Sequence, residues 1–596
     1  MSCEGPAAGA ADATIFGIFV IRITKKRKLK FTPEQEAIFE FVRRGQGHGI
    51  IDAVAGAGKT TTIMECARFA AEPGAVLFCA FNNAIAREIG QKFARRGMGA
   101  VTVQTMHSLG LRILRDHVGP RVDLELRPNK YASLLRSAEM QQQLAPHLKR
   151  LRELSRAGGR GYGTSDKDLK FRIQHRLVDI SHKHRSTLNG PSFAEFKEMV
   201  RHYGVFPAHE ARSKTFGDEL ETYYAAHRLL LTAGTQQAAR QYVLDFTDMI
   251  YLPFIWKLEA ATTFDWIFID ECQDLSRAQF AVAAKYGRTG SRVLAVGDPR
   301  QSIYGFTGAD AASFDRVARM TRATRLPLTT CFRCPRLVID LAREIRSDIT
   351  GAKTEPGRVE TIPPARVAEL ARPGDLVISR LRAPLLVLIF DLIDRGVKVS
   401  VAPDEADEFM GELSGLFKRD ELRASIKRRY KTFAALRDVV LQRNRWVIRQ
   451  QAAALPKASD REAFLAAEND YLDKRLAFLG RKHAAWQKRC TTVAKVLDRL
   501  RQYVSAEAGA VRLSTIHRAK GLEEDRVFII DYDQLPLDRP QQQEWEQFQE
   551  ENLKYVAITR AKSALFLVES PEEAEEAPPA RPEGQQRVSL RGLRIG

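Results

Sequence analysis

The chain has 596 residues, which is too long for one hydrophobic core and predicts about four domains. Its residues are 44% hydrophobic and 28% charged, a composition typical of folded proteins that excludes a wholly disordered chain. The formal net charge of +20 indicates a polyanionic partner, with nucleic acid favoured over an anionic membrane.

The N-terminal segment holds the chain's most anchor-like run. This apolar run, Ile15 to Ile23, is interrupted by Arg22 and is far shorter than the roughly 20 residues that span a bilayer. It precedes the basic cluster Lys25–Lys28, the reverse of the order in a secretory signal. We therefore expect residues 1–30 to form a basic arm and the protein to have no membrane partner. The expected location is cytoplasmic, or nuclear if the host is eukaryotic.

A helix start comes next. Thr32 is placed to cap a helix with Pro33 at its first position and Gln35 in its first turn. Because this helix lies shortly before the nucleotide motif described below, the Gln35 amide is a candidate for hydrogen bonding to an adenine edge.

The apolar segment Gly49–Asp52 runs into a turn of small residues and then into a helical pattern. The turn matches the phosphate-loop pattern G-x-x-x-x-G-K-[ST], except that Ala53 replaces the first glycine. Such a loop wraps polyphosphate with backbone N–H groups at a helix N-terminus. Lys59 would reach the β- and γ-phosphates, and Thr60 would hold Mg²⁺. The flanking strand and helix favour this interpretation over a flexible turn. The predicted nucleotide-binding residues of the loop are Ala55, Gly56, Ala57, Gly58, Lys59, Thr60 and Thr61.

Two further strands are expected, Val76–Ala80 and one that begins at Val101, and polar residues follow both. In an open parallel sheet, residues that contact ligands lie at the carboxyl ends of the strands. Phe81 is therefore either a core residue or a platform on which a base stacks.

A buried strand, Trp266–Ile269, leads directly into Asp270 and Glu271. Carboxylates at a strand end are unfavourable unless they are paired or bind a metal. With a phosphate loop in the same chain, Asp270 would hold Mg²⁺ and Glu271 would orient or deprotonate the attacking water. The two motifs together indicate a nucleoside triphosphatase.

Another strand, Val293–Val296, precedes a polar turn that contains Gln301. Gln301 stands where a γ-phosphate sensor would be useful. Tyr304 and Phe306 are aromatic residues close to the same turn.

Two stretches between these motifs are expected to be inserted helical subdomains. In the first, residues 122–242, basic side chains cluster around the Gly-rich loop Ala157–Gly163, and a solvated face and a phosphate-binding surface are equally favoured. In the second, residues 403–508, a short break just before Ser459 separates two long helical patterns. Ser459 and Glu462 have the spacing of a capping box at the start of the second helix. This second stretch is either a solvated hairpin or an arm that contacts a duplex or a partner.

Cys331 and Cys334 have the C-x-x-C spacing. No second pair of Cys or His stands nearby to complete a zinc site, so metal binding is disfavoured. The seven cysteines are spread along the chain, and a reducing compartment is expected.

The ordered series of motifs resembles that of the UvrD/Rep-type superfamily 1 DNA helicases, over roughly residues 31–110, 243–335 and 510–568. The wording of several motifs is closest to the F-box DNA helicase branch, although no F-box is evident. The segments that carry the resemblance are Phe31–Gln35, the phosphate loop, Asp270–Asp274, Gly297–Ala309, Phe332-Arg333, Thr515–Glu523 and Tyr555–Lys562.

The resemblance implies roles for individual residues. Gln35 would read adenine, Phe332 would stack on it, and Glu523 would contact the nucleotide. The implied catalytic residues are Lys59, Glu271, Gln301 as γ-phosphate sensor, and Arg333 and Arg560 as arginine fingers. The implied DNA-contacting residues are Phe81, Asn82, Thr105, His107, Asp248, Tyr304, Phe306, Thr515 and His517. Cys331, Cys334 and Arg380 depart from the family's usual residues, which affects local contacts rather than the ATPase.

The fold implied is α/β, with two RecA-like parallel-sheet motor domains and two mainly helical inserted subdomains. Motor domain 1A comprises residues 31–121 and 243–325, with insertion 1B at 122–242. Motor domain 2A comprises residues 326–402 and 509–568, with a short insertion 2B at 403–508, and residues 569–596 are expected to be a disordered tail. The strands expected in 2A are Leu376–Ser379, Lys398–Val401, Val527–Asp531 and Ala564–Val568.

The function implied is an ATP-dependent 3′→5′ DNA helicase or translocase acting in DNA repair, recombination or replication. It would use ATP with Mg²⁺ and bind single-stranded DNA and junctions of single and double strands. A protein partner could bind 2B or the tail. Three alternatives stay open: a translocase that strips proteins from single strands, an ATP-gated subunit of a nuclease or phage-defence assembly, and an RNA helicase.

Overall fold

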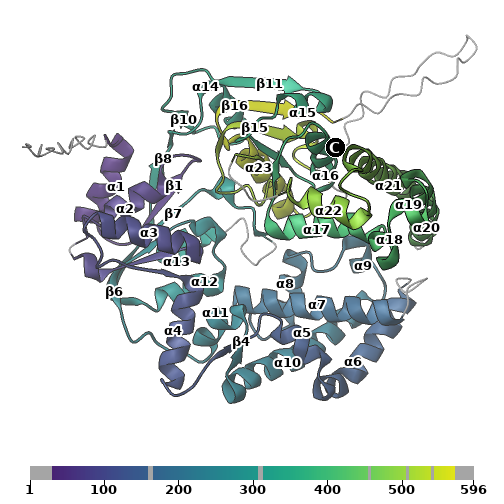
Figure 1. Ribbon diagram of the computed structural model, residues 1–596. Coiled ribbons are helices and arrows are strands. Elements are labelled where there is room, and N and C mark those ends of the chain that lie inside the picture. The colour runs from purple at the N-terminus through teal and green to yellow at the C-terminus, as the bar shows by residue number, and fades with distance from the viewer. Residues whose placement is uncertain are drawn as a thin grey trace, which may run out of the picture.

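The computed structural model describes residues 30–570, except for 71, 159–165, 306–312, 454–457, 505–508 and 539–541. At its centre are two six-stranded sheets, each flanked by helices (Figure 1). The expected α/β class with two parallel-sheet halves is confirmed. Residues 1–29 of the expected basic arm and residues 571–596 of the expected tail lie outside the described residues.

The first sheet has the strand order β3-β2-β6-β7-β1-β8, and all of its pairs are parallel. Its inner strands are buried on both faces, as helices covering a parallel sheet require. β8 ends at Leu328, so residues 326–328, expected in the second motor domain, belong to the first sheet. In sheet order the strands are β3 (Thr102–Thr105), β2 (Val76–Ala80), β6 (Phe264–Ile269), β7 (Gly287–Gly297), β1 (Gly49–Ala53) and β8 (Thr324–Leu328).

The helices around the first sheet begin at local capping signals. At α1 the Thr32 hydroxyl accepts the Gln35 N–H at 3.2 Å, and the Gln35 side chain accepts the Thr32 N–H at 3.0 Å. This capping box confirms the helix start expected from the sequence. The helices are α1 (Pro33–Arg44), α2 (Lys59–Cys66), α3 (Asn83–Arg95), α4 (Met106–Val118), α11 (Phe246–Ile255), α12 (Arg277–Ala284) and α13 (Ser313–Thr321).

The second sheet has the order β11-β16-β15-β12-β14-β13 and is also parallel throughout. A short link of β9 (Thr330–Cys331), α14 (Arg336–Ala342) and β10 (Thr350–Gly351) joins it to the first. In sheet order the strands are β11 (Arg358–Ile362), β16 (Ala561–Val568), β15 (Glu524–Ile530), β12 (Leu376–Ser379), β14 (Val511–Thr515) and β13 (Val399–Ser400). The helices of this half are α15 (Val367–Leu370), α16 (Ala383–Asp394) and α23 (Glu544–Ile558).

The first helical insertion lies at the bottom of Figure 1 and has its own hydrophobic core, in which Leu144, Leu177 and Leu230 are fully buried. The chain enters and leaves it beside a two-stranded pairing of β4 (Glu125–Leu126) with β5 (Val243–Leu244). Its helices are α5 (Lys130–Arg136), α6 (Ala138–Ala157), α7 (Asp166–Thr187), α8 (Phe193–His202), α9 (Ala208–Ala211) and α10 (Phe216–Gln241).

The described residues of the second insertion share a hydrophobic core with the second sheet. Phe409, Leu436 and Leu472 belong to one buried cluster with Val377 and Phe528 of the second sheet. α21 begins at Ala458, so Ser459 lies inside the helix instead of at its N-cap, and the expected capping box of Ser459 with Glu462 is wrong. The helices are α17 (Pro403–Gly415), α18 (Arg419–Arg423), α19 (Ile426–Arg429), α20 (Phe433–Ala453), α21 (Ala458–Trp486) and α22 (Val493–Arg501). Across the described residues, none of the helices combines the length and apolarity that crossing a bilayer would take.

Candidate nucleotide and DNA site

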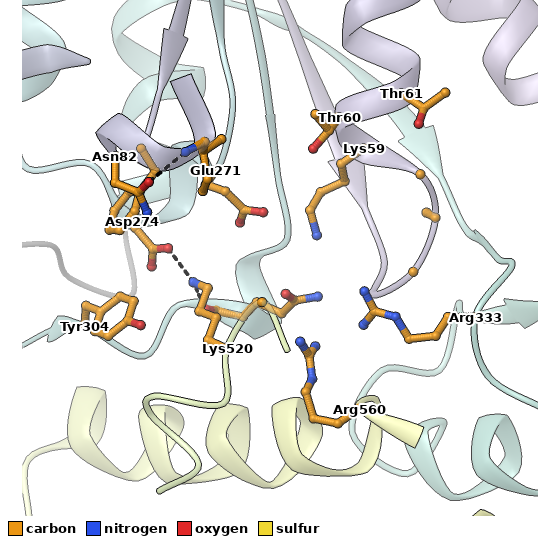
Figure 2. Close-up of a pocket in the computed structure, with 17 residues that line it drawn as sticks. Lys59, Thr60, Thr61, Asn82, Glu271, Asp274, Tyr304, Arg333, Lys520 and Arg560 are labelled. Carbon is orange, nitrogen blue, oxygen red and sulfur yellow. Dashed lines mark hydrogen bonds and ion pairs between the residues drawn. The ribbon is translucent and has the colours of Figure 1, made fainter. Parts of the chain in front are cut away.

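A cavity of about 320 Å³ lies between the two parallel-sheet halves (Figure 2). Loops of the first sheet form one side of it, and residues that follow β14 and α23 form the other. Its volume falls in the range of small-molecule sites. The predicted nucleotide and catalytic residues that line it are Gly56, Ala57, Gly58, Lys59, Thr60, Thr61, Glu271, Gln301, Arg333 and Arg560.

The phosphate loop forms one wall, and β1 delivers it to the carboxyl edge of the first sheet. Gly56 and Gly58 have positive φ values of 69° and 78°. A Cβ at Gly56 would lie 2.7 Å from the Cβ of Arg333, so only glycine fits this backbone conformation and this close approach. The Lys59 side chain points into the cavity (Figure 2).

Ala55 does not line the cavity, which corrects its predicted role. Its amide N–H donates a hydrogen bond to the Tyr555 hydroxyl at 3.0 Å. Because a backbone amide carries a single donor, this group is not available to a phosphate oxygen.

The acidic side of the cavity carries the predicted metal and water-activating residues. The Thr60 hydroxyl donates to Asp270 Oδ2 at 2.9 Å, so the two predicted Mg²⁺ ligands are neighbours. Burial raises the pKa of Asp270, and the adjacent Glu271 carboxylate raises it further. A buried carboxylate of this kind beside a hydroxyl fits a divalent cation.

Glu271 has the backbone conformation φ 54°, ψ 44°, which non-glycine residues rarely adopt. Its side chain lines the cavity, and the Gln273 amide donates a hydrogen bond to it. Such left-handed residues cluster at functional sites, where the surrounding structure holds them in place.

Gln301 is held by a chain of polar contacts. Its Nε2 donates to Asp298 Oδ2 at 2.8 Å, and Arg346 Nη1 donates to Asp298 Oδ1 at 2.7 Å. Arg346 Nη2 donates to Asp52 Oδ1, also at 2.7 Å. A residue of the link between the two halves therefore fixes the predicted sensor.

Arg333 and Arg560 make the opposite end of the cavity strongly basic. Arg560 is 1% exposed, and its burial together with the nearby Arg333 lowers its pKa to about 10. Arg333 Nη1 donates to the Thr559 carbonyl at 3.0 Å, and Arg333 also pairs with Glu523. The Arg333 Nε is buried and has no hydrogen-bond partner among the described residues. Two guanidiniums clustered at one end of a cavity fit a polyphosphate.

Lys520 also lines the cavity, although the sequence motif that contains it did not predict a role for it. Its Nζ donates to the Asp274 carboxylate (Figure 2). The same Nζ donates to the Gln301 carbonyl at 2.6 Å. It also lies 5.1 Å from the centre of the Tyr304 ring. The position of this lysine within the motif Thr515–Glu523 was the only sequence feature that could have indicated its role. Its hydrogen-bond partners lie more than 200 positions away in sequence, so the sequence could not identify them.

Gln35, Phe332 and Glu523 lie outside the cavity lining. Gln35 is buried, and its Nε2 donates to the Thr62 hydroxyl at 2.9 Å. Phe332 is 43% exposed. The predicted adenine contacts of Gln35 and Phe332 and the predicted nucleotide contact of Glu523 stay predictions.

A second cavity adjoins the first. It is lined by Phe81, Tyr304 and His107 among the predicted DNA contacts, and by His182 and Thr247 of the first helical insertion and the segment that follows it. The Phe81 and Tyr304 rings stack with centroids 6.2 Å apart at an angle of 15°. Phe81 and Tyr304 line both cavities, so a ligand in either one would touch the same aromatic pair.

Two predicted DNA contacts are buried inside the protein. Asp248 is 0% exposed, and its carboxylate accepts hydrogen bonds from Lys130 at 2.6 Å and from Arg185 at 2.8 Å. An ion-paired carboxylate with no exposed surface cannot contact DNA directly, so that prediction is wrong for Asp248. Thr105 is 5% exposed and caps α4 by accepting the Ser108 N–H.

The other predicted DNA contacts are distributed around the cleft. Asn82 is exposed and caps α3, where its Oδ1 accepts the Ile85 N–H at 2.9 Å. Thr515 and His517 are partly exposed, and the His517 carbonyl accepts a hydrogen bond from the Tyr304 hydroxyl at 3.2 Å. Phe306 lies outside the described residues.

Comparison with known protein families bears on this site. The profile of the UvrD/REP helicase N-terminal domain matches residues 31–321, and that of the UvrD-like helicase C-terminal domain matches residues 488–571. The chain belongs to the UvrD/REP helicase family. The two matched segments of this UvrD/REP member contain Lys59 and Arg560 respectively, on opposite sides of the cavity.

Individual relatives agree with this assignment. The chain is 24% identical over 570 residues to F-box DNA helicase 1 of Gallus gallus, covering 91% of this chain and 49% of that protein. It is 27% identical over 348 residues to ATP-dependent DNA helicase UvrD2 of Mycobacterium tuberculosis, covering 50% and 46%. It is 24% identical over 329 residues to ATP-dependent DNA helicase PcrA of Staphylococcus aureus, covering 51% and 39%. The chain thus spans about half the length, or less, of these curated relatives.

Proposed function

We propose that this protein is an ATP-dependent DNA helicase or translocase that moves along single-stranded DNA. The observation that carries the proposal is that Lys59, at the start of α2 in the first half, and Arg560, just after α23 in the second half, line one cavity. A site split in this way makes ATP hydrolysis depend on closure of the two halves, and product release then permits them to separate.

The chain's own residues have distinct tasks in the hydrolysis step. Lys59 and the loop amides of residues 56–61 bind the phosphates. Glu271 orients the attacking water and accepts its proton. Gln301, fixed through Asp298 and Arg346, contacts the γ-phosphate. Arg333 and Arg560 stabilise the charge that develops on the transferred phosphoryl group.

Mg²⁺ fits beside Thr60 and Asp270, whose oxygens are 2.9 Å apart. When bound there, Mg²⁺ would supply positive charge that offsets the negative charge of the phosphates. Removal of divalent ions with a chelator is expected to stop turnover, and addition of Mg²⁺ is expected to restore it.

Coupling to DNA is proposed to run through the wall that the two cavities share. Phe81, Asp274 and Tyr304 line both cavities. A movement of Asp274 would therefore displace a base that is stacked near Phe81 and Tyr304. Lys520 binds Asp274 from the second half, so closure around ATP moves the aromatic pair and the lysine together.

The 3′→5′ polarity, the preference for strand junctions and the pathway are proposals that rest on family membership. The deciding experiment is unwinding of 3′-tailed and 5′-tailed duplexes with ATP. Unwinding of the 3′-tailed substrate alone is expected, and unwinding of the 5′-tailed substrate alone would overturn the polarity. Removal of bound protein from single strands without unwinding would indicate a stripping translocase. ATPase stimulation by poly(dT) but not by poly(U) is expected for a DNA track.

A further inference from the structure

Cys331 and Cys334 form a dithiol pair beside the proposed ATPase site. Both side chains are 0% exposed, and the Cys334 N–H donates to the Cys331 sulfur at 3.5 Å. The only residues between them are Phe332 and Arg333, and Arg333 lines the nucleotide cavity. Within the described residues, no third His, Cys, Asp or Glu completes a metal-binding group around them.

The pair lies where the two halves of the protein meet. A Cβ at Gly56 would lie 2.9 Å from the Cys331 sulfur, so this thiol packs against the phosphate loop. The Cys334 sulfur donates to the Thr559 carbonyl at 3.7 Å. Arg333 Nη1 donates to the same carbonyl at 3.0 Å. One thiol therefore contacts the first half, the other contacts the second, and Arg333 shares an acceptor with Cys334.

The two thiols differ from each other in acidity, because the hydrogen bond with Cys331 and burial raise the pKa of Cys334 well above its ordinary value. Hydrogen bonding from Cys334 and the nearby backbone amides, aided by Arg333, lowers the pKa of Cys331 to about 6. Burial instead raises the pKa of Cys66 and of Cys79. A thiolate at neutral pH is the nucleophile that thiol–disulfide exchange requires.

We propose that Cys331 and Cys334 are a reversible disulfide site that switches the ATPase off by moving Arg333. The proposal rests on the function proposed above for the cavity. A disulfide shortens the contact between the two sulfurs to a covalent bond, and it removes the Cys334 hydrogen bond to Thr559. The backbone that carries Arg333 is closed into a small ring, which draws the guanidinium away from the phosphates.

The chemistry needs a low-molecular-weight disulfide, such as oxidised glutathione, as the oxidant. The Cys331 thiolate attacks one sulfur of that disulfide, forming a mixed disulfide and releasing one thiolate. The Cys334 thiol loses its proton and attacks the Cys331 sulfur, which forms the internal disulfide and releases the second thiol. Two electrons pass from the pair of cysteines to the reagent, which is reduced to two thiols.

Access to the pair requires the two halves to separate, because both thiols are buried between them. A non-hydrolysable ATP analogue that holds the halves together is therefore expected to slow the oxidation. This links the switch to the nucleotide cycle, since the motor would be oxidised in its open, nucleotide-free state.

The test treats the full chain with oxidised glutathione, blocks remaining thiols by alkylation, and maps disulfides by peptide mass spectrometry. An internal Cys331–Cys334 disulfide is expected. The kcat for DNA-stimulated ATP hydrolysis is expected to fall at least about tenfold and to recover with dithiothreitol, since a lost arginine finger is worth more than that. Absence of this disulfide, or a mapped disulfide with unchanged kcat, would overturn the proposal.

The matched control is Cys490→Ser. Cys490 is also buried, and its sulfur donates to the Lys495 carbonyl at 3.5 Å. This variant should be inactivated by oxidation as the wild type is, whereas Cys331→Ser and Cys334→Ser should resist. Loss of activity in both serine variants on oxidation would contradict the switch. If either variant fails to fold, disulfide mapping in the wild type and recovery of its kcat with dithiothreitol still test the proposal. Disulfide mapping does not depend on ATP turnover. A reduced protein without ATPase activity would therefore refute the proposed function, whereas the mapping would still show whether Cys331 and Cys334 form a disulfide.

Discussion

The Tyr555 hydroxyl accepts a hydrogen bond from the Ala55 amide at 3.0 Å, across 500 positions of sequence. Both residues are fully buried. Tyr555 lies on α23, slightly more than one turn before Arg560, and Ala55 opens the phosphate loop. The contact therefore ties the predicted phosphate loop to the helix that precedes the proposed arginine finger, Arg560.

Tyr555→Phe is expected to lower the thermal midpoint of unfolding, because a buried amide left without a partner costs about 1–3 kcal/mol. It should also raise the KM for ATP, since the loop loses one anchor. Calorimetry and steady-state ATPase assays measure both. Tyr224→Phe is the control, because its hydroxyl bonds the exposed Pro191 carbonyl, where water can replace it. An equal loss in both variants would mean that the Ala55 contact is of no special importance.

Lys59→Ala is expected to abolish ATP turnover and leave single-stranded DNA binding largely intact. Lys59 points into the nucleotide cavity and is absent from the lining of the second cavity. ATP hydrolysis and fluorescence anisotropy with labelled oligonucleotide check the two parts. Lys285→Ala, which removes an ion pair with the exposed Glu259 and lies outside the lining of both cavities, is the comparison variant. Normal hydrolysis in Lys59→Ala would remove the assignment of the phosphate loop.

Arg560→Ala is expected to lower kcat by about a thousandfold with a much smaller change in KM, the behaviour of a group that acts mainly in the transition state. Arg560→Lys should recover little, because an ammonium does not reproduce the planar guanidinium. Steady-state kinetics over a range of ATP concentrations separate the two constants. Equal losses in binding and turnover would argue against an arginine finger.

Lys520→Ala is expected to weaken the stimulation of ATPase activity by DNA more than it weakens the basal rate. The variant removes the cation that bridges Asp274 and Gln301 beside the aromatic pair. It should also shift the acid limb of the pH profile upward. Burial already raises the pKa of Asp274 to about 6, and Lys520 is the main group that opposes this rise. Unchanged stimulation and an unchanged profile would exclude coupling through Lys520.

Stability is expected to fall as the pH is lowered from about 6.5 towards 4. Burial, with nearby Arg185 and Arg228, lowers the pKa of His184 from 6.5 to about 4, and burial lowers that of His227 well below 6.5. Above pH 6.5 both imidazoles are neutral in the folded and the unfolded state and contribute nothing. Below it the unfolded state binds protons first, so His184 alone costs about 3 kcal/mol once the pH reaches 4.

Thermal unfolding at pH 7.5 and pH 5 measures this loss. His227→Leu should reduce the difference in thermal stability between the two pH values. Both ring nitrogens of His227 are buried and have no hydrogen-bond partner within the described chain. His175→Gln, an exposed position on the same insertion, is the control and should leave the difference unchanged. A difference that persists in full in His227→Leu would assign the pH dependence to other groups.

Several features of the site could be predicted from the sequence because they depend on residues that are close together in the chain. The phosphate loop needs glycines with positive φ next to a buried strand, and Gly56 and Gly58 supply them. The Thr32–Gln35 capping box starts α1 within four residues. Asp270 and Glu271 follow a buried strand directly, so their position at the sheet edge is fixed by the strand itself.

Other features could not be predicted because they depend on which distant groups meet. Asp248 has the sequence context of a surface contact, yet Lys130 and Arg185 bury its carboxylate. The Ala55 amide is indistinguishable in sequence from its neighbours in the loop, and only the approach of Tyr555 excludes it from the phosphates.

The sequence by itself determined the class of this protein: a phosphate loop, an acidic strand end and two later basic motifs, in the order typical of one helicase family. The tertiary structure decided how these parts work together. It joined Lys59 to Arg560 in one cavity, joined Lys520 to Asp274, and placed Cys331 and Cys334 between the halves. Motifs are built from neighbours in the chain, whereas a cleft between two sheets is built from residues that only folding brings together.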